Sequence, residues 1–167
     1  MLQLKPLPVD SIPMALVKAK HYRLLNEPWQ AESICRDVLN VDPDNQTAIT
    51  YLILAITDQF TNDSTATAGQ ARSLCAKLTD KFEYNYYRGI IAERAGNTTL
   101  KRNIPRVNFM AFEYYNRAMN FYETAQSLKP NDNDDAVLRW NACVRRIKEF
   151  KLEAAPEDAG VQPFLDV

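Results

Sequence analysis

Glycine is scarce in this chain, which has four glycines among its 167 residues. They stand at positions 69, 89, 96 and 160. Phosphate-cradling loops and dinucleotide-binding turns need several glycines within a few residues, so this spacing argues against nucleotide-binding motifs of that kind. The chain also has no large excess of charge of one sign, since it contains 20 basic and 21 acidic residues. A nearly neutral chain has little attraction for a phosphate backbone, and we therefore expect no nucleic-acid partner.

Residue types that often carry chemistry are few, with one histidine and three cysteines. His21 has no acid or thiol neighbour at helical spacing, and we interpret it as a solvated histidine rather than a general base. Cys35, Cys75 and Cys143 are far apart and form no Cys-x-x-Cys pair, so we expect buried thiols that hold neither a metal nor a disulfide. The sequence thus predicts a protein that is not an enzyme, with no catalytic residue, no metal and no cofactor.

Long hydrophobic runs are absent, since the longest covers residues 51–56 and is far too short to cross a bilayer. Pro6 and Pro8 interrupt the amino-terminal region where a secretory signal needs a continuous apolar segment. We therefore expect a cytoplasmic protein without membrane insertion.

Hydrophobic residues make up 46% of the chain and charged residues 25%, which is enough to close the core of one domain. Apolar residues recur at steps of three and four along most of the chain, and this period is typical of amphipathic helices. We expect a helical domain over 11–152, an extension over 1–10 and a tail over 153–167. The expected helices cover residues 12–25, 27–41, 46–60, 68–81, 83–95, 109–129 and 135–152.

Helix boundaries are predicted from capping residues and breakers. Ser11, Asn26 and Asp44 are the expected amino-terminal caps of the first three helices. Gly96 with Asn97 is the expected carboxyl-terminal stop of the fifth. Residues 98–108 then form a basic insertion, the longest expected loop.

An internal repeat is visible when Ile12 is set as the first position of a unit of 34 residues. Small residues, an aromatic and a proline then fall at positions eight, eleven, twenty and thirty-two, as Ala19, Tyr22, Ala31 and Pro43. This pattern resembles the tetratricopeptide repeat (TPR) family, over most of residues 12–150. Later segments match other positions of the unit through Gly89, Gly96, Ala118, Tyr122, Ala125 and Pro130. The sequence departs from the family pattern at Ile53, at Arg88 and in the two inserted loops.

The resemblance implies an all-α fold in which antiparallel helix pairs stack as a right-handed superhelix of about three repeats, closed by the helix over 135–152. In this family the first helix of each pair lines a concave groove, and the family's positions select the residues that face a partner. They are Leu16, Lys20, Arg23, Thr50, Leu54, Tyr86, Ile90, Glu93, Arg94, Asn141 and Arg145. The family's carboxylate clamp is not carried over, because Leu16 and Lys20 stand where its Lys and Asn belong.

Two functions remain open at this point. The first is a non-enzymatic interaction module whose groove binds a peptide or helix of a protein partner. In that reading Leu54, Tyr86 and Ile90 make the apolar contacts. The alternative is a structural subunit that forms a homo-oligomer or joins a larger complex through its exposed edges and its basic terminal helix. That helix carries Arg139, Arg145, Arg146, Lys148 and Lys151.

Overall fold

The computed structural model describes residues 1–60 and 65–156, and within these residues the regular secondary structure is all helical, as the sequence predicts. A short 3-10 helix precedes seven α-helices in that part of the chain. Their bounds are η1 (Val9–Ser11), α1 (Ile12–Leu24), α2 (Pro28–Val41), α3 (Gln46–Asp58), α4 (Thr65–Cys75), α5 (Lys81–Thr99), α6 (Val107–Ser127) and α7 (Asp135–Glu149).

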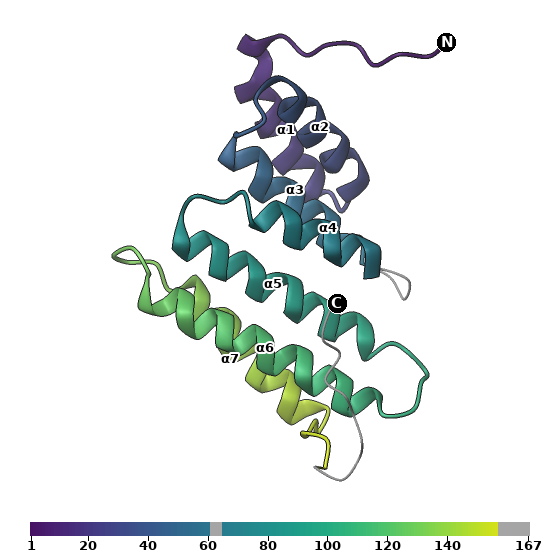
Figure 1. The fold of residues 1–167 in the computed structure, drawn as a ribbon, viewed down its shortest axis with the longest axis vertical. Helices are drawn as coiled ribbons and strands as arrows, with labels where there is room; N and C mark the ends of the chain where they lie inside the picture. The colour runs from purple at the N-terminus through teal and green to yellow at the C-terminus, as the bar shows by residue number, and fades with distance from the viewer. Residues whose placement is uncertain (61–64, 157–167) are drawn as a thin grey trace.

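The helices follow one another along the long axis of the molecule (Figure 1). Each helix packs on the next one in the chain, and short connections turn consecutive helices back on each other. In addition, α1 touches α3, and α3 touches α5. The odd-numbered helices therefore lie next to one another along one side of an elongated stack, with α1 and α2 at one end and α7 at the other. None of the described helices is both long and apolar enough to span a bilayer.

The predicted capping residues are wrong at the starts of α2 and α3. At α1 the predicted residue, Ser11, stands at the N-cap position, but its side chain makes no capping hydrogen bond. Asn26 has a positive φ of 60° and ends the turn after α1, so Glu27 is the residue that precedes α2. At α3 the cap is Asn45, whose Oδ1 accepts from the amide of Ala48 at 2.9 Å. Neighbouring polar residues compete for one position, and the local turn geometry decides between them.

The predicted end of α5 at Gly96 is also wrong, because the helix continues to Thr99. Gly96 is buried inside the helix, and a Cβ atom there would lie 3.3 Å from Tyr114 Cβ and 3.3 Å from Tyr115 Cζ. This glycine therefore permits close approach of α6 and does not terminate α5. As a result, the connection to α6 is shorter than the predicted insertion and covers residues 100–106.

The core runs through the stack as adjoining clusters of small and large side chains. Ala19 and Ala31, which the repeat places at the crossing of the first helix pair, are both fully buried. The predicted burial of the three cysteines is confirmed, since Cys35, Cys75 and Cys143 are free thiols with no exposed surface. Burial raises the pKa of each of these thiols from 9.0 to about 12.

Candidate functional site

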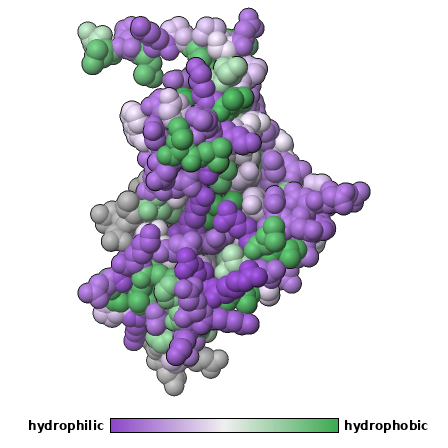
Figure 2. All heavy atoms as spheres, turned by 180° about the vertical axis from the view of Figure 1, so that it is seen from behind, coloured by the Kyte–Doolittle hydropathy of each residue, from purple (hydrophilic) through white to green (hydrophobic). Residues whose placement is uncertain are grey.

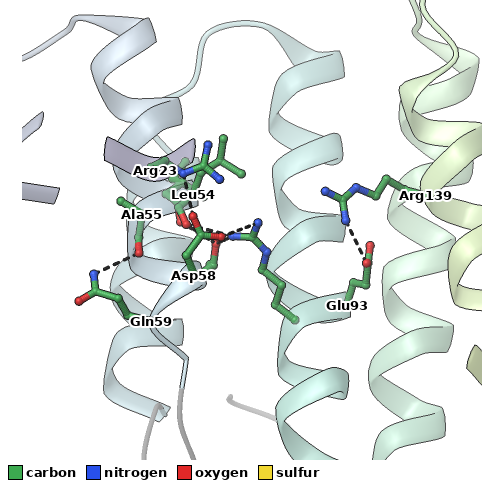
Figure 3. A network of polar contacts seen from close by, with 10 residues as sticks. Arg23, Leu54, Ala55, Asp58, Gln59, Glu93 and Arg139 are labelled. Atoms are coloured by element: carbon green, nitrogen blue, oxygen red, sulfur yellow. Dashed lines mark hydrogen bonds and ion pairs between the residues drawn. The ribbon is translucent and has the colours of Figure 1, made fainter. Parts of the chain in front are cut away.

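Five charged side chains from the odd-numbered helices form two neighbouring groups of ion pairs on one side of the stack, and we call them the polar ladder. They are Arg23 of α1, Asp58 of α3, Arg94 and Glu93 of α5, and Arg139 of α7. Figure 3 shows Arg23 and Asp58 meeting beside α3, and Arg139 reaching across toward Glu93. The ladder joins helices that are far apart in the sequence and marks the side of the molecule that the groove prediction selects.

Asp58 is held between two arginines. The Nε of Arg23 donates to one carboxylate oxygen at 2.7 Å, and a terminal nitrogen of Arg94 pairs with the other oxygen at 2.7 Å. The three side chains are only 21%, 23% and 18% exposed, in the order Arg23, Asp58 and Arg94. Since each oxygen has its own partner, this carboxylate fixes the spacing of α1, α3 and α5.

Arg94 has further partners on α3. Its second terminal nitrogen donates to the backbone carbonyl of Leu54 at 3.0 Å and also to the hydroxyl of Thr57. Burial lowers the pKa of Arg94, while the nearby carboxylate of Asp58 opposes that shift. Arg94 is thus oriented by three residues of α3, and its side chain is a fixed part of the surface.

Glu93 is a buried carboxylate with two partners. The Tyr122 hydroxyl donates to its Oε2 at 2.6 Å, and Arg139 donates to its Oε1 at 3.1 Å. Burial, together with the charge of Glu93, raises the pKa of the Tyr122 hydroxyl. Burial lowers the pKa of Arg139, but attraction to Glu93 and Tyr122 outweighs it, and the net shift is upward. Glu93 therefore connects α5 with both α6 and α7.

A pocket of about 350 Å³ opens between α5 and α7, next to this carboxylate. We call it the α5–α7 pocket, and its walls carry two acids, two arginines and an amide. Tyr115 of α6 also lines it and donates from its hydroxyl to Asn97 Oδ1 at 2.6 Å. The lining residues are Glu93, Asn97, Tyr115, Ala142, Cys143, Arg145, Arg146 and Glu149. Donors and acceptors on opposite walls suit a polar side chain or a backbone amide of an extended peptide.

The structure brings several of the predicted partner-binding residues together. Arg23, Glu93 and Arg94 belong to the polar ladder, and Leu54 contributes its carbonyl to that network. Arg145 lines the α5–α7 pocket together with Glu93. Leu16 and Asn141 are half-buried, and Lys20 is exposed.

Two of the predicted residues are part of the core. Thr50 is 5% exposed and donates its hydroxyl to the carbonyl of Thr47, and Ile90 is 1% exposed. Neither offers surface to a partner. Tyr86 is half-buried, and its ring stacks on that of Phe82 with centroids 5.7 Å apart. Tyr86 therefore packs against the core, and only part of its side chain is open to a partner.

Sequence reasoning left Asp58, Asn97 and Arg139 out of the predicted set. Asp58 lies one helical turn after Leu54, so the helical period that selects Leu54 also places Asp58 on the same face of α3. Arg139 appears in the sequence only as one cation of a basic helix. The sequence predicts Asn97 at the end of the fifth helix, but it lies within α5, which continues beyond Gly96, and its side chain lines the pocket.

Comparison of the chain with protein-family models, with curated proteins and with solved structures finds no match. Among the described residues, no three histidine, cysteine or acidic side chains gather where they could hold a metal ion. Seen from behind, the surface between the two ends of the stack is largely hydrophilic, and hydrophobic atoms form separate patches (Figure 2).

Proposed function

We propose that this protein is a non-enzymatic, TPR-like interaction module that binds an extended peptide along the side formed by α1, α3, α5 and α7. The observation that carries this proposal is the α5–α7 pocket. It has a volume of about 350 Å³ and lies beside the fixed charges of the polar ladder. A pocket of this size accepts one or two peptide side chains. The ladder provides preorganised polar groups for the neighbouring part of the peptide, which lowers the entropic cost of binding.

The charges of the site favour a weakly acidic peptide. The ladder and the pocket together contain five arginines and three carboxylates, so the excess is positive but small. Most of these guanidinium groups already pair with a carboxylate of the protein. We therefore expect binding to weaken only gently with salt, unlike a site that neutralises many phosphates.

A non-enzymatic role agrees with the state of the ionisable groups. The three thiols are buried and have pKa values raised to about 12, so they are poor nucleophiles at neutral pH. Glu93, the buried carboxylate of the site, is engaged on both oxygens by Tyr122 and Arg139. These two donors compete with any substrate proton for the carboxylate, which is unfavourable for a general base.

A peptide selection followed by calorimetry tests the proposal. A random peptide library is selected on the immobilised protein, and the affinity of the best peptide is measured for the wild type, Arg145→Ala and Lys148→Ala. Both cations are exposed on α7, but only Arg145 lines the pocket. We expect Arg145→Ala to weaken binding about tenfold, and Lys148→Ala to change it less than about twofold. Equal effects of the two changes, or a selection that yields no peptide, would contradict the proposal.

A further inference from the structure

One exposed row on α1, which is apolar except for His21, has no partner in the described part of the chain, and we call it the α1 edge. It consists of Met14, Val17, His21 and Leu24, at successive steps of three, four and three residues. Met14, Val17 and Leu24 are 60%, 61% and 76% exposed, and His21 is exposed as well. This spacing is that of a coiled-coil seam, so the four side chains lie in one row along the helix.

The α1 edge lies opposite the buried face of α1. Each helical residue advances by about 100°, which places Val17 and His21 on the far side from Ile12, Ala15 and Ala19. Those three residues are the buried ones of the helix. Therefore α1 is apolar on two opposite faces, and only one of them contacts α2 and α3. Leu25 and Trp29, which follow α1 in the sequence, are also 54% and 69% exposed. Hydrophobic atoms are visible over this N-terminal part of the molecule in Figure 2.

The two ends of the stack differ in this respect. The exposed surface of α7 is mostly charged, through Arg145, Arg146, Lys148 and Glu149, with Leu138 and Trp140 as its exposed apolar residues. A stack of helix pairs needs polar outer faces at its ends, because an apolar end face invites another element to cover it. The helix α7 meets this requirement better than α1 does.

The charges beside the α1 edge decide what can cover it. Lys18 and Lys20 are exposed and flank the row on opposite sides. A second copy of α1 packed antiparallel on this edge would bring each lysine next to its own counterpart. A parallel pairing would place the two His21 rings against each other in the seam. Both arrangements of a homodimer are therefore disfavoured, whereas acidic side chains on both flanks of the partner would be attracted.

We propose that the α1 edge docks an amphipathic helix of a partner protein. The partner helix has an apolar seam flanked by acidic residues, and its docking extends the stack by one helix. This inference does not depend on the peptide site, because the α1 edge and the α5–α7 pocket lie on different elements of the stack. It places the assembly surface on the amino-terminal edge and not on the basic terminal helix.

Two synthetic peptides of three heptads provide the probes. Both peptides have Leu at the two seam positions, a and d, of each heptad. The flanking positions e and g are Glu in one peptide, the Glu peptide, and Lys in the other, the Lys peptide. Like charges on the flanks prevent each peptide from pairing with itself, and an isolated helix of this length is only marginally stable, so a gain of helix in circular dichroism reports docking. Binding is measured by fluorescence anisotropy for the wild type, Val17→Glu and Leu138→Glu. The last is a matched control, because Leu138 is 64% exposed at the other end of the stack.

We expect the Glu peptide to bind and to gain helix, and the Lys peptide to show no binding. Val17→Glu should weaken the Glu peptide by about tenfold or more, while Leu138→Glu should change it less than about twofold. The proposal would be overturned if the two peptides bound with equal affinity, or if Val17→Glu bound the Glu peptide as tightly as the wild type does. It would also be overturned if light scattering showed that the protein is a dimer and that Val17→Glu dissociates it, because a second copy would then cover the edge. Sedimentation with phosphatidylserine vesicles that Val17→Glu abolishes would instead assign the edge to a lipid surface.

Discussion

Gly89 of α5 lies directly against the ring of Tyr122 of α6, where a Cβ atom on the glycine would be 2.4 Å from the ring carbon Cε1. No side chain fits at this crossing. The same tyrosine donates its hydroxyl to Glu93, one turn further along α5. The close approach of the two helices and the orientation of the buried carboxylate therefore depend on one pair of residues.

Replacing Gly89 by Ala should destabilise the protein. The added methyl group must displace the ring of Tyr122, which is fully buried, and we expect the free energy of unfolding to fall by about 1 to 3 kcal/mol. Urea denaturation measures this change. Gly69→Ala is the control, because its Cβ would meet only the tip of Arg72 at 3.7 Å. Alanine favours the helix there, so stability should stay the same or rise by up to about 1 kcal/mol. Equal urea midpoints for the two variants would show that α5 and α6 are far enough apart at Gly89 to accept a methyl group.

Removing the central carboxylate of the polar ladder should also be costly. Asp58→Asn leaves Arg23 and Arg94 close together without the negative charge between them, and we expect a loss of about 2 kcal/mol, since these side chains are partly exposed. Asp134→Asn is the matched control, since that carboxylate is 65% exposed and pairs with Lys129 at the surface. Its removal should cost less than about 1 kcal/mol. Thermal unfolding of both variants tests the difference, and a cost for Asp58→Asn as small as that of the control would refute the role of the ladder.

The buried thiols predict how stability depends on alkaline pH. Their folded-state pKa is raised from 9.0 to about 12, so the unfolded chain loses these protons first as the pH rises. Their contribution to stability is therefore complete below about pH 9 and declines between about pH 9 and 12. Cys75→Ala should make this decline shallower in urea titrations at a series of pH values. An unchanged slope would mean that this thiol is accessible to solvent.

The sequence predicted the helices well because their period is local. Apolar residues at steps of three and four locate all seven helices of the described chain, and the small residues Ala19 and Ala31 mark a helix crossing that the structure contains. Caps were predicted less well. Asp44 and Asn45 are equally suitable by residue type, and only the backbone conformation of Asn45 lets its side chain reach Ala48.

The site could be predicted only in part, because it depends on contacts between distant segments. The groove positions indicate which helices line the site, but not that Arg23 and Arg94 share the carboxylate of Asp58. Ile90 fits a groove position by sequence, yet the neighbouring helices bury it. The hydroxyl of Tyr122 and the carboxylate of Glu93 are 29 residues apart, and no periodic pattern connects them.

Mapping a bound peptide onto the protein tests the central claim most directly. Amide chemical shifts of the isotopically labelled protein are followed by NMR while the peptide selected from the library is added. We predict that the largest changes cluster around Asn97 on α5 and Arg145 on α7, and extend along the polar ladder toward Asp58. Changes confined to α2, α4 and the outer face of α6, with Asn97 and Arg145 unmoved, would contradict the account.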